Sequence, residues 1–269
     1  MLRFSTFKRL LTLFGVSALP LLLSHCTHHR PIPVPVDDKK IIVETVDTTH
    51  VSSVVLTGHM HVNINTQLNH PHLSFSIPKY DIDQTNIIIK NGTLYINNTN
   101  NRVLPTHYQL TLGTHLTSLS LNGDVAVSSQ HLDAKKLTVI DASGGHVDLN
   151  GQMDIQRIYA NQFSHLSVTW VDSPQLVLYA NDHAHVKLAG VAKEFYIHLA
   201  GNALLDAQYL RASSVTISSN DFSQAHLMPL FSFQGFAHQN STVYLYHQPL
   251  HRNTHTWEMA NIFMKTYRP

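Results

Sequence analysis

The sequence predicts an all-β protein, a single-domain β-solenoid with rungs of about 19 residues and a short C-terminal helix as its cap. Most segments beyond residue 41 alternate apolar and polar residues, as strands with one buried face do. Helical periodicity is almost absent between Leu121 and Val243, where Asn, Asp, Ser and Gly recur as turn residues. Apolar residues also recur at a nearly constant spacing through the same region. Together these three observations favour stacked rungs of short strands.

The N-terminus, residues 1–26, has the features of an export signal. Three basic residues precede the apolar run Leu10–Leu23, which is too short to span a bilayer. The segment Leu23–Cys26 resembles the lipobox of bacterial lipoproteins, in which the cysteine is lipidated, although His25 stands where a small residue is usual. An ordinary cleaved signal peptide is the alternative. We expect lipidation at Cys26.

Anchoring at Cys26 would explain the residues that follow it. Cys26 is the only cysteine, and an unmodified thiol is a liability in an oxidising compartment. Thr27 follows it, and the absence of Asp at this position resembles lipoproteins sorted to the outer membrane. Residues 27–41 are rich in proline and favour an extended linker. The predicted location is therefore the cell envelope, with the domain lipid-anchored to the outer membrane on its periplasmic or surface face.

The repeat within the body, residues 42–250, is defined by seven apolar positions that are 19, 18, 20, 19, 20 and 19 residues apart: Leu121, Ile140, Ile158, Leu178, Ile197, Ile217 and Phe236. Each precedes a polar turn residue, in order Asn122, Asp141, Asn161, Asn181, Asn202, Asn220 and Asn240. A second apolar column comprises Val147, Leu166, Val186, Leu205 and Val243. Because a solenoid rung buries its apolar face only against neighbouring rungs, we expect both columns to form inward ladders.

Two other architectures compete with the solenoid. The spacing of Leu116, Leu119 and Leu121 is similar to that of a leucine-rich repeat. However, the asparagine that such a repeat requires does not recur, and no rung has a helical half. A β-sandwich remains open, because short strands at even spacing suit it as well.

Four segments, taken in order, resemble the family known as putative auto-transporter adhesin, head GIN domain: Val54–Ile64, Asn91–Ile96, Leu137–Leu149 and Asn240–Tyr246. The resemblance covers about residues 45 to 249, and the Ser-Gly-rich turns of the family are partly kept at Ser143-Gly-Gly145. It implies a β-solenoid in a cell-envelope protein with a binding or structural role. It implies no active site.

Histidine is the unusual residue, with 21 in the chain. Three His-x-His pairs occur, and residues i and i+2 of a strand face the same side, so each pair could offer two nitrogens to one metal ion: His59 and His61, His70 and His72, His183 and His185.

Stacked rungs provide a second arrangement of histidines. His146, His165 and His185 each precede an inward apolar residue and are expected to form one outward column. Such a column could bind Zn²⁺ or Cu²⁺ weakly, and no other cofactor is expected. A surface that is simply rich in histidine is the alternative. Because histidine titrates near about pH 6.5, the column also predicts lower stability in acid.

An enzyme acting on glycans is a further alternative, because some β-helices cleave polysaccharides with clustered carboxylates. Asp141, Asp148 and Asp154 are scattered, and nothing in their spacing brings two carboxylates together. The sequence also lacks a Gly-x-Ser-x-Gly elbow, a His-Glu-x-x-His motif, a phosphate loop and a dinucleotide fingerprint. We therefore expect no catalytic residues.

The tail, residues 251–269, predicts the capping helix. Thr256 can serve as its N-cap, with Glu258 in the first turn and Lys265 in the last. Trp257 and Met264 would share a face with Ala260 and either cap the solenoid or bind a partner.

The prediction for function is a cell-envelope lipoprotein whose solenoid is a non-catalytic interaction, adhesion-like or structural module. A periplasmic metal-binding protein that uses the His-x-His faces is the alternative, and a glycan-acting enzyme is the third. The expected partners are the membrane, through the anchor, and an envelope protein or polysaccharide, with self-association as a further option. Only 13% of residues are charged and the net charge is +1, so nothing predicts nucleic-acid binding.

Overall fold

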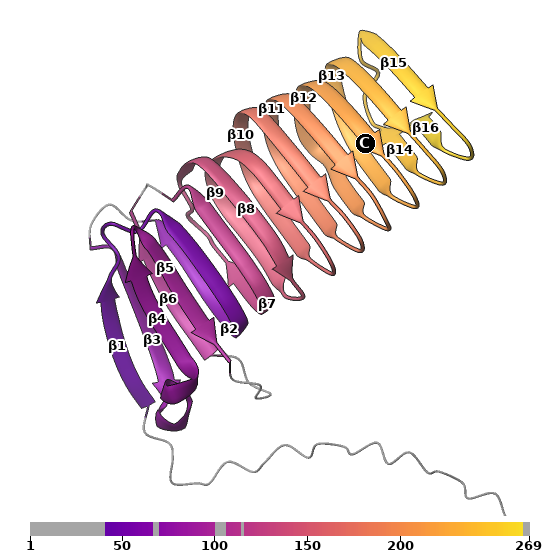
Figure 1. Cartoon of the computed structure of the whole chain (residues 1–269). Helices are drawn as coiled ribbons and strands as arrows, with labels where there is room; N and C mark the ends of the chain where they lie inside the picture. The colour runs from indigo at the N-terminus through magenta and orange to yellow at the C-terminus, as the bar shows by residue number, and fades with distance from the viewer. Residues whose placement is uncertain (1–40, 67–69, 100–105, 114–115, 266–269) are drawn as a thin grey trace, which may run out of the picture. The chain divides into compact units, whose positions relative to one another are not determined.

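The computed structural model describes residues 41–66, 70–99, 106–113 and 116–265, and all of them belong to one compact unit, residues 34–269 (Figure 1). The predicted signal peptide, Cys26 and nearly all of the Pro-rich linker lie outside the described residues. The fold described below is therefore that of the body and the tail.

The described ranges contain sixteen strands, which join into one sheet that winds around the core. A short 3-10 segment, η1 (Lys79–Gln84), is the only helical element there, and no helix in these ranges is long and apolar enough to cross a membrane. The strands are β1 Ile41–Asp47, β2 Ser53–Thr66, β3 His72–Pro78, β4 Thr85–Lys90, β5 Thr93–Asn98, β6 Thr106–Leu112, β7 Ser118–Ser128, β8 Ala134–Ser143, β9 His146–Ala160, β10 His165–Ala180, β11 His185–Leu199, β12 Leu204–Ser219, β13 Gln224–Ala237, β14 Thr242–Leu245, β15 His251–Thr256 and β16 Asn261–Met264.

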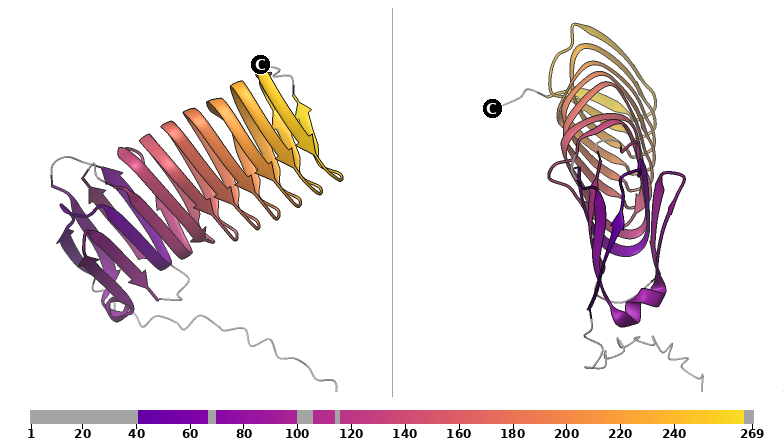
Figure 2. Two further views of the ribbon diagram at one scale, coloured as in Figure 1. Left: turned by 45° about the horizontal axis from the view of Figure 1, so that its top comes forward. Right: turned by 90° about the vertical axis from the view of Figure 1, so that its left-hand side faces the viewer.

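The predicted β-solenoid is confirmed, with about seven turns. Each of the long strands β10 to β13 follows a rung through a bend, so its two halves lie on opposite faces of the flattened coil (Figures 1 and 2). Neighbouring rungs pair in parallel, and the register shifts at the bend, for instance between Val168 and Val171 of β10. Parallel pairing in register is what stacks like residues into columns.

Four-residue turns connect successive rungs along one edge, which we call the turn edge. In each turn the backbone N–H of the fourth residue donates to the carbonyl of the first, at 3.2–3.4 Å. The second residue adopts the left-handed conformation, with φ between 59° and 68°. The turns are Asn161–Ser164, Asn181–Ala184, Ala200–Ala203, Asn220–Ser223, His238–Ser241 and Trp257–Ala260. The predicted turn residues Asn122 and Asp141 lie in strands instead.

The second predicted apolar column is confirmed. Val147, Leu166, Val186 and Leu205 are consecutive register partners, and Ala225 joins Leu205 to Val243. All six side chains are buried in one continuous core. All five predicted residues lie in this ladder, and the sequence analysis missed Ala225.

The first predicted column is correct only in its middle. Ile158, Leu178, Ile197 and Ile217 are consecutive register partners and are buried, as predicted. Leu121 is buried as well, but it belongs to a neighbouring column. Two markers are wrong: Ile140 is 36% exposed and pairs with Tyr159, and Phe236 pairs with Ser218 on the outer face. In each case the residue lies one position away from the inward column, and one position reverses the face of a strand.

The N-terminal end is built differently from the rest. The first half of β2 pairs with β5 and its second half with β6, so the single sheet divides there into two arms, which we call the sheets of this end. Antiparallel strands extend both: β4 pairs with β5, and β3 and β1 follow β6. β1 and β4 are therefore edge strands of opposite sheets at this end of the solenoid (Figure 1).

The predicted C-terminal helix is wrong, because the tail forms a further rung. β15 pairs in parallel with β13, and β16 pairs with β14. Trp257 and Met264 therefore do not share a helical face: Trp257 begins a turn and stacks on His238 at 4.2 Å, and Met264 ends β16. By pairing with β13 and β14, the tail satisfies the backbone N–H and C=O groups of those strands, which a helix would leave unpaired. This gain outweighs the weak local preference of the tail for a helix.

Candidate functional site

The predicted histidine column lies on one face of the solenoid. His165 of β10 is the register partner of both His146 in β9 and His185 in β11. The ring centroids of His146 and His165 are 5.6 Å apart with 18° between the planes, and those of His165 and His185 are 5.9 Å apart at 68°. Because the next residue of each strand is buried, the three imidazoles point outward.

This column extends further than its sequence indicates. His61 of β2 pairs with His107 of β6, with ring centroids 5.0 Å apart, and on its other side His61 pairs with Ala126 of β7. Since Val127 pairs with Val147, Ala126 lies beside His146. We call the five histidines the histidine row: His107, His61, His146, His165 and His185. Ala126 interrupts it, and a hollow of about 340 Å³ lies there.

The two histidines of the first His-x-His pair have different partners. His59 and His61 both lie in β2, but His59 Nδ1 is 2.7 Å from Asp124 Oδ2, and His61 contacts His107 instead. His107 is the member of the row that sequence reasoning missed. No motif links it to His61, because only the pairing of β2 with β6 brings the two together.

His183 and His185 do not share a strand as expected, because β11 begins at His185, and their role as metal ligands stays a prediction. His183 lies in a turn before β11 begins, and it stacks on Phe163 with centroids 5.0 Å apart. His70 likewise precedes β3, which begins at His72. In both pairs the first histidine occupies a connection, where the side-chain alternation of a strand does not apply.

The described part of the chain holds no group of three or more His, Cys, Asp or Glu side chains that could hold a metal ion. A Zn²⁺ ion lies about 2.0–2.1 Å from each histidine nitrogen, so two ligating rings must aim nitrogens at one point. Neighbouring rings of the row instead stack or meet edge to face. Weak Zn²⁺ or Cu²⁺ binding by His146, His165 and His185 stays a prediction.

Protonation of the histidine row is expected to lower stability in acid. Burial lowers the pKa of His185, and His165 lowers it further, against an opposing effect of Asp206. Burial is also the largest cause of the lowered pKa of His61. A lowered pKa means that the unfolded chain binds the proton more readily, so stability is complete above about pH 6.5 and is lost as the pH falls through the folded pKa.

Thermal unfolding at pH 7.5 and at pH 5 tests this expectation. The melting temperature should fall between the two, and His185→Gln should reduce the fall. His131→Gln, an exposed histidine outside the row, is the matched control and should leave it unchanged. A melting temperature that does not differ between the two pH values would contradict the prediction.

One of the three aspartates considered for glycan cleavage, Asp141, is a core residue. Asp141 is fully buried with Leu121 and Ala160 as register partners, and burial raises its pKa. Its Oδ1 accepts hydrogen bonds from the backbone N–H and the Oγ of Ser143, at 3.0 and 2.6 Å. This carboxyl group therefore faces the protein interior, whereas Asp148 is exposed.

Large apolar side chains are exposed in the bends of the rungs, and the sequence analysis did not predict them. Each of five successive rungs places one large apolar side chain at the surface between its two halves, and the most exposed are Leu250 at 75% and Trp170 at 72%. We call the five residues the bend stripe: Trp170, Val191, Tyr209, Phe231 and Leu250. The five residues do not form one register column, because Val191 pairs with Asp172 and Arg211 whereas Tyr209 pairs with Ala189.

Positively charged residues accompany the bend stripe. Arg211 is the register partner of Val191 and is exposed, and Lys193 is exposed two residues after Val191. Asp172, the other partner of Val191, is exposed as well. Exposed aromatic side chains next to arginine are typical of the residues that carry binding energy in protein interfaces. A sequence signal was present for the four stripe residues in β10 to β13, since each falls where the alternation of its strand is interrupted, whereas Leu250 lies between β14 and β15.

Several solved structures share this fold at low sequence identity. One, from Parabacteroides distasonis and described as a putative lipid binding protein, is 12% identical with a TM-score of 0.75, over 85% of this chain and 98% of its own. A putative adhesin from the same species is 11% identical with a TM-score of 0.67, over 85% and 95%. A putative adhesin from Parabacteroides merdae is 11% identical with a TM-score of 0.63, over 85% and 98%.

Comparison of the sequence itself gives the family. No curated protein matches the chain significantly. Residues 36–249, most of the chain, match the family described as putative auto-transporter adhesin, head GIN domain, close to the range that the four sequence segments indicated. The chain therefore belongs to the head GIN domain family of putative auto-transporter adhesins.

Proposed function

We propose that the protein is a non-catalytic, adhesion-like binding module that is tethered to the cell envelope through Cys26 and binds a partner protein along the bend stripe. The observation that carries the proposal is the repetition of one exposed apolar side chain in the bend of each of five rungs. Contiguous apolar patches are uncommon on a soluble surface unless something binds there.

The chemistry of the bend stripe favours a protein as the partner. Tryptophan, tyrosine and arginine are the residues most enriched where protein interfaces derive their binding energy. Trp170 and Tyr209 supply the aromatic side chains, and Arg211 supplies the cation. The description of family relatives as adhesins supports the same class of function.

Site-specific photo-crosslinking in intact cells tests the proposal. A photoreactive residue at Tyr209 is expected to give one discrete protein adduct. Trp170→Ser combined with Phe231→Ser should reduce its yield roughly 30-fold or more, since a central interface residue contributes about 2 kcal/mol. The matched control is Phe163→Ser with Phe222→Ser, which removes two similarly exposed aromatic side chains from the turn edge and should leave the yield unchanged.

Three outcomes would contradict the proposal: no adduct at Tyr209, an equal loss in the control, or a heterogeneous adduct that glycosidases degrade. The last would replace the protein partner by a polysaccharide.

The proposed tether makes a separate prediction. The wild-type protein should sediment with membranes and carry a lipid-modified N-terminus at Cys26, because the amide-linked and diacyl chains together anchor a protein stably. Cys26→Ser should release it into the soluble fraction. Mass spectrometry of the mature N-terminus and membrane fractionation measure both effects, and a Cys26→Ser variant that stays membrane-bound would contradict the anchor.

A further inference from the structure

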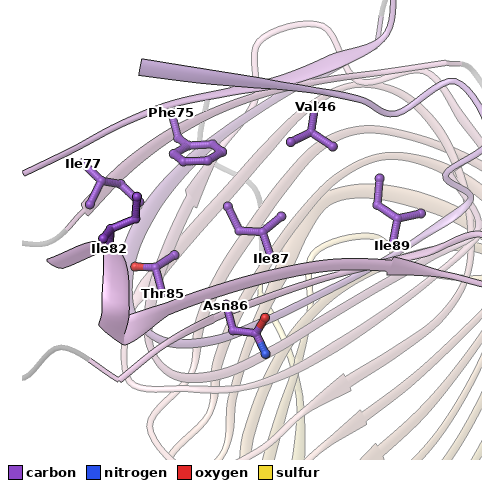
Figure 3. Close-up of a pocket in the computed structure, with 8 residues that line it drawn as sticks. All are labelled: Val46, Phe75, Ile77, Ile82, Thr85, Asn86, Ile87 and Ile89. Atoms are coloured by element: carbon purple, nitrogen blue, oxygen red, sulfur yellow. The ribbon is translucent and has the colours of Figure 1, made fainter. Parts of the chain in front are cut away.

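The two ends of the solenoid expose different kinds of side chain. At the N-terminal end, an open pocket of about 380 Å³ is lined mainly by aliphatic side chains, together with the ring of Phe75 (Figure 3). The last rung, at the C-terminal end, instead exposes the rings of His255 in β15 and of Trp257 just after it (Figure 1). Trp257 is 44% exposed. The C-terminal end therefore presents aromatic rings to solvent.

Both rings stack on rings of the preceding rung. His255 is the register partner of Phe236, and their ring centroids are 5.3 Å apart with 8° between the planes. Trp257 stacks on His238 in the same way, at 4.2 Å and 11°. These separations are close to the spacing of neighbouring strands, which is about 4.8 Å. The ring planes therefore lie across the solenoid axis, and the preceding rung covers one face of each ring.

The opposite faces of these two rings are not covered by a further rung. In the middle of the solenoid a ring is covered on both sides, since Tyr179 lies between Tyr159 at 5.2 Å and His198 at 4.8 Å. Within the described ranges, β15 pairs with β13 alone, so no other strand lies over His255 and Trp257. The last rung thus leaves uncovered two ring faces of the kind that interior rungs cover.

The two rings form one nearly flat surface. Their centroids are 5.8 Å apart and their planes differ by 21°. Because each ring stacks on a different ring of the preceding rung, the two lie side by side. Asn253 is exposed and faces the same side of β15, two residues before His255. We call these three residues the end platform: Asn253, His255 and Trp257.

The chemistry of the end platform favours a sugar chain. One face of a pyranose ring presents C–H groups, whose partial positive charge is attracted to the negative face of an aromatic ring. The hydroxyl groups around the sugar can pair with the side-chain amide of Asn253. In an extended, β-linked glucan, successive sugar rings are spaced much as the two protein rings are. A chain of this kind can therefore place one sugar on each ring.

Two other ligands that stack on aromatic rings fit less well. A second copy of this chain would have to bury Arg252 and Thr254, which occupy inward positions of β15, against its own end. Nucleobases are accompanied by phosphates, which require clustered basic residues, and Arg252 is the single arginine or lysine of β15. An uncharged glycan avoids both difficulties.

We propose that the end platform binds an extended, uncharged, β-linked polysaccharide, with one sugar ring stacked on Trp257, the next on His255, and Asn253 hydrogen-bonded to hydroxyl groups. The inference does not rest on the bend stripe. The strand order runs from β1 to β16, so the platform lies at the opposite end of the solenoid from β1 (Figure 1). A tether at Cys26 enters at β1 and would leave the platform accessible.

Tryptophan fluorescence of the full chain tests the proposal. The chain contains two tryptophans, so Trp170→Phe leaves Trp257 as the only one. Titration of this variant with cellohexaose, an extended β-linked glucose hexamer, should change the emission saturably and protect it from quenching by acrylamide. Maltohexaose, the curved α-linked isomer, is the matched control ligand. It should bind roughly tenfold more weakly, because it can lay only one ring flat on the platform.

Calorimetric titration with cellohexaose compares variants of the platform. Trp257→Ala should weaken binding roughly 30-fold, because it removes the larger of the two rings. Trp170→Ala removes an exposed tryptophan from the bend stripe and should bind as the wild type does. Trp257→Phe keeps a ring on His238 and should bind within about threefold of the wild type, which decides the matter if Trp257→Ala does not fold.

Three results would overturn the proposal: no response of the Trp257 emission to cellohexaose, equal binding of the two hexamers, or equal losses in Trp257→Ala and Trp170→Ala. It would also be overturned if the chain dimerised without sugar and Trp257→Ala abolished the dimer. The platform would then be covered by a second copy.

Discussion

Replacing Gly190 with alanine is expected to cost at least about 3 kcal/mol of folding free energy and to leave little soluble protein. Gly190 lies in the bend of β11 with φ at +136°, a conformation that residues with a side chain rarely adopt. A Cβ atom there would lie 2.2 Å from the carbonyl oxygen of Val171 and 2.6 Å from its nitrogen. Because Val171 is the register partner of Gly190 in the neighbouring rung, neither backbone can withdraw without breaking the stack.

Gly201→Ala is the matched control for this prediction. Gly201 is the second residue of a turn, with φ at +68°, and equivalent turns hold Asp182 and Asp221 at nearly the same angle. A Cβ atom at Gly201 would approach atoms of Asp182 at 3.0 Å, which a small shift relieves. We expect a loss of about 1 kcal/mol. Denaturant unfolding of both variants measures the difference, and equal losses would contradict the account of the bend.

The inward ladder at Val147, Leu166, Val186 and Leu205 was predictable because, from Leu166 on, each of these residues lies just after a turn of constant length. Each of them is reached from the turn that precedes it without crossing a bend. Parallel pairing then brings them into register. Local periodicity thus sufficed for the first half of each rung, and with it for the outward column of His146, His165 and His185.

The second half of each rung was harder to predict because the bends differ in length. Between β12 and β13 the register jumps from Ala207 paired with Leu227 to Arg211 paired with Met228. A position predicted by counting a fixed number of residues is therefore displaced along the strand. Phe236 was predicted to face the core, but the register partner of the inward residue Ile217 is Gly235. The bend stripe was missed for the same reason, because its residues lie where no periodic pattern applies.

The error at the C-terminus came from weighing local signals above the repeat. Thr256 and Glu258 fit the start of a helix, but the last turn also places a small residue, Ala260, at its fourth position. Ala184 and Ser223 occupy that position in other turns and are buried. A side chain facing the core at this point must be small, so the turn pattern was the better guide to the tail.

Deleting residues 251–269 is expected to lower the melting temperature by roughly 10 °C or more and to cause aggregation. The deletion removes β15 and β16 and uncovers the paired edges of β13 and β14, together with Phe233, Val243 and Leu245. Exposing large apolar side chains costs about 1.5–3 kcal/mol each, and in a body of this size each kcal/mol lowers the melting temperature by about 2–4 °C.

The natural end of the solenoid shows why the truncated one should aggregate. The last rung places Arg252, Thr254 and Thr256 in register with the buried residues Phe233, Gly235 and Ala237. Polar and charged residues at inward positions of a terminal strand discourage a second molecule from pairing with it. Truncation would instead end the stack on an apolar strand with free backbone groups.

A shorter deletion provides the control. Ending the chain after Lys265 removes residues 266–269 and keeps both strands of the last rung, including the backbone hydrogen bond from Lys265 to Leu245, so stability should be unchanged. Differential scanning calorimetry and size-exclusion chromatography compare the two truncations. If the longer deletion melts as the full chain does and stays monomeric, the last rung is not needed as a cap, and its surface would be free to serve association instead.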